Sequence, residues 1–205
     1  MYFTGCPVFA PEKPILTPYY PETLVDRQRS GEWYGELKLK SKRGVITINE
    51  DNKVDFFLYK TKNTIKIKGE ALNRIENMGL PPCSIFDCSL LEHNYETRLW
   101  IFDCLVFGGK QLHNIAMIKR RQHLDRLVTD DLIWVPLISD FWMRELDLIK
   151  LRDSSLIKET ALKSGIPYQD FKRFVTGMVI KNKNTFLSFP AKTRFVASSM
   201  FKINL

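Results

Sequence analysis

A chain of 205 residues, 44% of them hydrophobic, is long enough for one well-buried domain and short for two, so we expect a single domain over residues 1–205. Its 31 basic and 23 acidic residues leave a net charge of +8, which suits a nucleic-acid or nucleotide partner without requiring one. The N-terminus is not a signal peptide, the apolar stretch 132–140 is too short to span a bilayer, and the cysteines lack zinc-like spacing. We therefore expect a cytoplasmic protein with reduced thiols and no membrane partner.

The N-terminal elements lead to a dense group of cations. Residues 1–21 contain five prolines and predict an extended lead-in, and residues 22–29 predict a short helix. Residues 33–40 alternate apolar and polar side chains, and 45–48 is a β-branched run, so we predict that the two strands form a hairpin. Its tip would carry Lys38, Lys40, Lys42 and Arg43. These like charges predict an anionic ligand, or alternatively a solvated edge strand whose lysines prevent sheets from associating.

The middle of the chain contains the most apolar segments. Strands are predicted at 54–59, 64–68, 84–91 and 98–107, with a helix at 70–78. Asp87 and Asp103 interrupt the last two strands. Because a buried carboxylate needs a hydrogen-bond or charge partner, each is either a structural tie or a site residue.

The C-terminal half is mainly helical, and helices are predicted at 114–127, 141–151, 154–163 and 168–174. The basic triplet 119–121 is expected on a solvated face of the first of these helices. A strand at 175–181, a turn at 182–184, a strand or loop at 186–189 and a closing segment at 195–205 complete the chain. This mixed order of strands and helices indicates the α+β class.

Five short motifs occur in order over nearly the whole chain: Glu36 to Arg43, Asp87 to Ser89, Phe102 to Gly109, Thr176 to Lys181, and Lys202 to Asn204. They lie over the patterns ExKxDGxR, aspartate-glycine-glutamate, phenylalanine-aspartate with a glycine turn, EGxVxK and KxK. In these motifs the chain resembles the adenylation domain of ATP-dependent DNA ligases, among the covalent nucleotidyltransferases that include RNA ligases and mRNA capping enzymes. The resemblance implies an ATP-grasp-like ligase core of mixed antiparallel sheets flanked by helices. Ligases of this family generally carry an OB-fold domain beyond the last motif, and we expect none in this chain.

The resemblance also implies a nucleotide site. ATP would be the substrate, with GTP or NAD as alternatives, and the Lys38 amine would take AMP as a phosphoramide. A lysine must be neutral to attack, and the neighbouring cations would disfavour its charged form. By the same resemblance, Glu36 would read the adenine amino group, Arg43 would contact ribose and phosphate, Phe102 would stack on adenine, and Lys181 and Lys202 would hold the α-phosphate.

Five positions depart from the family pattern. Lys40 replaces an aspartate and Ser41 replaces a glycine. Ser89 replaces the ribose-binding glutamate, and Thr176 replaces a glutamate tied to metal chemistry. Asn204 replaces a lysine. Magnesium is a possible cofactor and no metal-ligating residue is predicted, because magnesium prefers carboxylate ligands and two of them are replaced. One hypothesis is that adduct formation is lost. The other is that Lys40 supplies part of the positive charge of the metal, and the reaction proceeds slowly.

Two functional hypotheses follow from the resemblance. The first is an ATP-dependent polynucleotide ligase-like nucleotidyltransferase with weakened activity, and the second is an inactive ligase-derived protein that binds nucleic acid, nucleotide or a protein partner. Nucleic acid would meet a basic surface that includes Lys119, Arg120, Arg121, Lys172 and Arg173. Full nick sealing would require either a partner chain that supplies the OB-fold function or unusual nucleic-acid contacts from this one domain. If the nucleotide cleft is only vestigial, ATP, GTP and NAD should cause no thermal shift.

Overall fold

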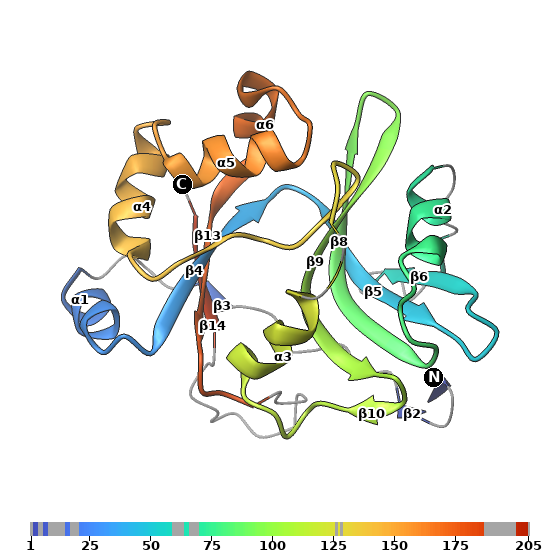
Figure 1. The fold of residues 1–205 in the computed structure, drawn as a ribbon. Coiled ribbons are helices and arrows are strands. Elements are labelled where there is room, and N and C mark those ends of the chain that lie inside the picture. The colour runs from blue at the N-terminus through green and yellow to red at the C-terminus, as the bar shows by residue number, and fades with distance from the viewer. Residues whose placement is uncertain are drawn as a thin grey trace. The chain divides into compact units, whose positions relative to one another are not determined.

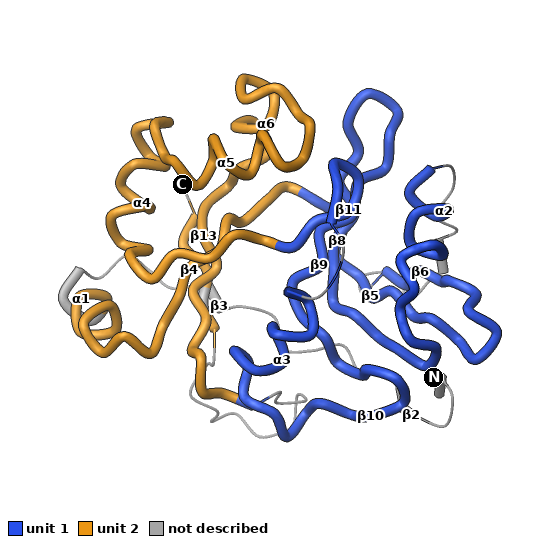
Figure 2. The backbone as a smooth tube through the Cα atoms, viewed as in Figure 1, with its two compact units in different colours: residues 1–12, 41–135, 186–191 blue, residues 13–40, 136–185, 192–205 orange. Residues whose placement is uncertain are grey.

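The computed structural model describes residues 2–3, 6–7, 15–16, 21–58, 64–65, 70–125, 127, 129–186 and 200–204. Within these ranges the chain forms two large sheets accompanied by helices, which confirms the α+β class (Figure 1). The chain divides into two compact units (Figure 2). Unit 1 comprises residues 1–12, 41–135 and 186–191, and unit 2 comprises residues 13–40, 136–185 and 192–205.

Unit 1 is built on a seven-stranded sheet in the order β10-β9-β8-β5-β6-β7, with β11 parallel to β9. The strands are β5 (Lys42–Ile48), β6 (Val54–Leu58), β7 (Thr64–Ile65), β8 (Ser84–His93), β9 (Glu96–Phe107), β10 (Lys110–Gln111) and β11 (Ile133–Trp134). The helices are α2 (Glu70–Asn77) and α3 (Met117–Leu124), and β1 (Tyr2–Phe3) pairs with β2 (Cys6–Pro7). The core lies where alternate sheet residues such as Ile46 and Phe86 meet Ile75 of α2 and Leu124 of α3.

Unit 2 is built on a five-stranded sheet in the order β12-β4-β13-β14-β3. The strands are β3 (Ile15–Leu16), β4 (Trp33–Leu39), β12 (Ile138–Ser139), β13 (Val175–Asn182) and β14 (Met200–Asn204). The helices are α1 (Pro21–Arg29), α4 (Trp142–Lys150), α5 (Ser155–Lys163) and α6 (Tyr168–Phe174). Trp142 of α4 packs so closely on Gly35 of β4 that a Cβ there would lie 2.5 Å from its side chain. The Gly35 face of β4 is therefore covered by α4.

The predicted cationic hairpin is wrong. β4 pairs with β12 and β13 in unit 2, whereas β5 pairs with β6 and β8 in unit 1. Alternation of apolar residues predicts a strand but does not specify its neighbour, which depends on contacts distant in sequence. As a result Lys38 and Arg43, five residues apart in the chain, belong to different sheets.

Most predicted elements occur with shifted ends. The helix expected at 114–127 begins only at Met117, with Ala116 rather than Asn114 at its cap. The two long apolar strands extend further than predicted, to 84–93 and 96–107. Residues 59, 66–68, 187–189, 195–199 and 205 of the predicted strands and closing segment lie outside the described residues, as does most of the lead-in. Within the described ranges, no helix has the length and apolar character needed to cross a membrane.

The two buried aspartates of unit 1 have the charge partners that their burial requires. Asp87 pairs with Arg43, and Asp103 pairs with Arg120 of α3 through Nε–Oδ1 and Nη2–Oδ2 bonds of 2.9 and 2.8 Å. Arg120 is fully buried and also donates to the carbonyl of Ile115. The expected solvated face at 119–121 is therefore wrong for its second and third residues, because Arg121 is buried as well.

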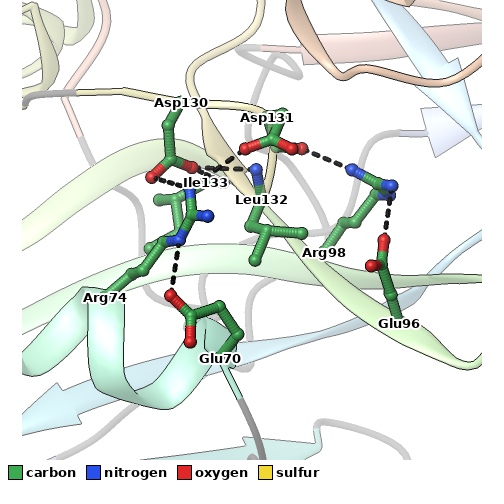
Figure 3. Close-up of polar contacts among 8 residues, drawn as sticks. All are labelled: Glu70, Arg74, Glu96, Arg98, Asp130, Asp131, Leu132 and Ile133. Atoms are coloured by element: carbon green, nitrogen blue, oxygen red, sulfur yellow. Dashed lines mark hydrogen bonds and ion pairs between the residues drawn. The ribbon is translucent and has the colours of Figure 1, made fainter.

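A further ion network in unit 1 holds α2 against the segment before β11 (Figure 3). Arg74 of α2 contacts Glu70 within its helix, and it also contacts Asp130 and Asp131 at 2.7 and 3.0 Å. Asp130 in turn accepts hydrogen bonds from the backbone amides of Leu132 and Ile133. The hydrogen bond to Asp130, and then the one to Glu70, raise the pKa of Arg74 above its ordinary value. This network fixes the loop that leads into β11.

Candidate nucleotide site

Three lysines and one glutamate lie on one face of the unit 2 sheet, and we call this group the lysine face: Glu36, Lys38, Lys181 and Lys202. Across the ladders, Glu36 lies opposite Val179, and Val179 lies opposite Lys202. Residues opposite one another share a face, and side chains along a strand alternate between faces. The five-stranded sheet therefore gathers side chains from three strands that are distant in sequence.

Two members of the lysine face neutralise each other. The Lys181 amine lies 2.5 Å from a carboxylate oxygen of Glu36, and both residues are buried, with 5% and 3% of their surface exposed. The resemblance implies that Glu36 reads adenine and Lys181 holds the α-phosphate. In this structure they form an ion pair, so a phosphate at Lys181 would compete with the glutamate for the same amine.

The Lys38 amine is half-buried and meets a neutral partner. Its Nζ donates a hydrogen bond to Thr176 Oγ1 at 2.9 Å, and the Thr176 hydroxyl donates to the Lys38 carbonyl at 3.2 Å. Burial, and then the positive charge of Lys202, lower the pKa of Lys38 below the ordinary value of 10.5. A larger fraction of this amine is therefore neutral at a given pH than for an exposed lysine. Thr176 appeared in the sequence only as a departure from the family pattern, so its contact with Lys38 was not foreseen.

We expect Lys202→Met to raise the pKa of Lys38, because it removes the cation that disfavours the charged amine. NMR titration of isotope-labelled lysines in the folded protein measures this shift. Lys183→Met is the control, since Lys183 pairs with Asp140 at 2.9 Å and does not contribute to the shift of Lys38. An equal upward shift in both variants would refute the assignment to Lys202.

A second group of candidate residues lies in unit 1. Arg43 of β5 makes a two-pronged contact with Asp87 of β8, with Nε–Oδ1 and Nη2–Oδ2 distances of 3.2 and 2.6 Å. Its guanidinium lies 5.2 Å from the ring centroid of Phe102 on β9. A carboxylate and an aromatic ring thus hold this arginine in a fixed orientation, and a planar guanidinium suits both contacts.

The chain is similar in fold to solved structures that include ligase domains. The chain matches the ligase domain of LigD from M. tuberculosis with a TM-score of 0.53 and 11% identity, covering 84% of this chain and 53% of that one. It matches mycobacterial DNA ligase D complexed with ATP and MES with a TM-score of 0.54 and 12% identity, covering 93% and 59%. A structure named Pmar-Lig_Pre matches with a TM-score of 0.57 and 15% identity, covering 98% and 47%. No protein-family model and no curated protein sequence matches the chain.

The fold of this chain is like that of these ligase domains. The ligase-like α+β architecture expected from the motifs is thereby confirmed. The chain spans about half the length of the ligase structures that it matches. At these identities the likeness concerns the fold alone.

The other predicted cations and the serine hydroxyls at positions that depart from the family pattern belong neither to the lysine face nor to the group around Arg43. Lys40 is exposed, while Lys42 pairs with Glu92 at 2.8 Å. The Ser41 hydroxyl donates to the Ser89 hydroxyl at 3.0 Å. Throughout the described part of the chain, no group of three or more histidine, cysteine, aspartate or glutamate side chains is placed to hold a metal ion.

Two of the five residues of the basic surface expected to meet nucleic acid are not exposed in the structure. Arg120 and Arg121 are buried, so they cannot present their charge to a phosphate backbone. Lys119 and Arg173 are exposed, and the Lys172 amine lies 5.7 Å from the ring centroid of Tyr168. Burial of the two arginines could not be foreseen, because a basic triplet on a short helix ordinarily faces solvent.

Proposed function

We propose that this chain is an ATP-dependent nucleotidyltransferase of the polynucleotide ligase type that forms a lysine–AMP adduct at Lys38. The observation that carries the proposal is the setting of the Lys38 amine on the lysine face: half-buried, bonded to a neutral hydroxyl, and with a lowered pKa. A solved structure with this fold is a DNA ligase complexed with ATP, which supports ATP as the substrate. GTP and NAD are the alternatives to compare.

In the proposed reaction, neutral Lys38 Nζ attacks the α-phosphorus of ATP. The nitrogen–phosphorus bond forms as the bond from the α-phosphorus to the bridging oxygen breaks, and pyrophosphate leaves with that electron pair. The nitrogen then loses a proton to solvent, which leaves a neutral phosphoramide nitrogen. Lys202, on the same face of the sheet, would stabilise the negative charge that grows on the phosphate oxygens.

Phe102 and Arg43 have the proposed roles of stacking on adenine and contacting ribose. Arg43 already lies over the Phe102 ring, so an adenine that stacks on Phe102 would either share the ring with the guanidinium or displace it. Asp87 would keep the arginine oriented in either case. Lys181 would reach the α-phosphate after separating from Glu36.

Covalent labelling tests the proposal. Incubation with ATP labelled at the α-phosphate, with and without magnesium, should label wild type through a bond that survives denaturation and is broken by acid. Label from the γ-phosphate should not be retained, because it leaves with pyrophosphate. Absence of α-label under both conditions would contradict adduct formation.

A second candidate function is binding without catalysis, and the buried Glu36–Lys181 pair favours it. That pair occupies two of the groups assigned to the nucleotide, and opening it leaves charges to be compensated. The chain would then bind nucleotide, nucleic acid or a protein partner, including one that supplies an OB-fold. A thermal shift with ATP but no covalent label identifies this alternative, since a ligand that binds only the folded state stabilises it.

A further inference from the structure

Thr176 is placed against Lys38 by an irregularity in the sheet. Val175 lies opposite Leu39 and Gly177 lies opposite Lys38, so Thr176 is the extra residue of a β-bulge between β13 and β4. A bulge redirects the side chain that it carries. Gly177 permits this geometry because its φ is +146° and a Cβ there would lie 1.9 Å from the carbonyl oxygen of Ile203.

The direction of the two hydrogen bonds of Thr176 matters for the chemistry. A hydroxyl has one hydrogen, and Thr176 donates it to the Lys38 carbonyl. Its oxygen therefore accepts from the Lys38 amine, and that amine is the donor. A neutral amine that donates one N–H keeps its lone pair free for attack. A carboxylate in this position would hold the amine as an ammonium ion instead.

We infer that Thr176 is a positioning residue that holds the Lys38 amine in its attacking orientation. Lysine has a flexible four-carbon stem, so an unrestrained amine would sample many positions. The hydroxyl ties the end of that stem to the backbone of the same lysine without adding a negative charge. This inference rests on the proposed function, because the orientation matters only if Lys38 is the nucleophile.

Three substitutions at Thr176 test the inference with two readouts. The first readout is the NMR titration midpoint of Lys38 without nucleotide, and the second is the rate of α-label incorporation at a pH where Lys38 is fully neutral. Thr176→Val keeps the shape but removes the acceptor, so it should lower the midpoint and slow labelling about 10- to 100-fold. Thr176→Glu should raise the midpoint by about one to three pH units. Thr176→Ser keeps the hydroxyl, so it should retain most of the wild-type labelling rate.

A general structural role would not move the midpoint in opposite directions in the valine and glutamate variants, and thermal unfolding of each variant checks its folding. If the valine variant does not fold, the serine and glutamate variants still provide the comparison. Suppose that wild type takes the label. If the valine variant is then labelled equally fast, or if the glutamate variant has an unchanged midpoint, the inference about Thr176 is overturned while the proposed function stands. Wild type that takes no label at any pH would overturn the proposed function and this inference together.

Discussion

Replacing Lys38 with arginine is expected to abolish covalent labelling by ATP. Arginine keeps the positive charge and much of the length of the side chain, but its guanidinium stays protonated and has no nucleophilic lone pair. The label on Lys38→Arg should therefore fall to background. Denaturing electrophoresis followed by detection of the α-label measures the result. Lys150→Arg on α4 is the matched control, since Lys150 is exposed and pairs with Asp147, and its label should equal that of wild type.

The pH dependence of labelling provides an independent check on the nucleophile. The labelling rate should rise with pH as Lys38 loses its proton, and the midpoint of this rise should lie below pH 10.5 because the folded pKa is lowered. Between the folded and unfolded pKa the unfolded chain binds more protons, so this group also makes stability rise with pH in that window and has no such effect below it. Label that persists on Lys38→Arg would show that another residue is the nucleophile.

Replacing Asp103 with asparagine is expected to destabilise the protein by about 3–5 kcal/mol, because it leaves the Arg120 guanidinium buried without a countercharge. Both nitrogens that contact Asp103 lose an ionic acceptor, and the bond from the Cys104 amide to the carboxylate is weakened as well. Asp103 follows Phe102 on β9, so the pair also secures the strand that carries the proposed adenine contact. Urea unfolding with linear extrapolation measures the free energy of unfolding.

Two comparisons separate charge burial from general disruption at this site. Glu92→Gln breaks the half-exposed pair with Lys42 on the same sheet and should cost less than about 1 kcal/mol. Joint replacement of Asp103 and Arg120 by leucine and methionine should recover much of the loss, since no charge then remains buried. If Asp103→Asn costs no more than Glu92→Gln, the buried pair is not a major source of stability.

The sequence predicts whether a segment is a helix or a strand more fully than it predicts which segments pack or pair with it. Period-two alternation identified β4, and the apolar runs identified β8 and β9, because burial of one face or of both leaves that pattern in the sequence. The need of Asp87 for a partner followed from its apolar setting. Its partner, Arg43, lies 44 residues away, and no local pattern specifies such a contact.

The candidate site shows the same division. The motifs named Lys38, Lys181 and Lys202 in advance, and the register of the sheet brings them to one face. The pairing of Lys181 with Glu36 was not foreseen, and neither was the hydroxyl that Thr176 offers to Lys38. Each depends on the alignment of β13 with β4, and the bulge at residue 176 is a feature of that alignment.

By itself the sequence determined the α+β class, the positions of most helices and strands, and the resemblance to ligase adenylation domains, because propensity, periodicity and short motifs are local properties. Only the tertiary structure decided that β4 and β5 belong to different sheets, that Arg120 is buried against Asp103, and that a neutral hydroxyl meets the Lys38 amine. The physical reason is that strand pairing, desolvation and hydrogen-bond geometry depend on residues brought together from distant parts of the chain.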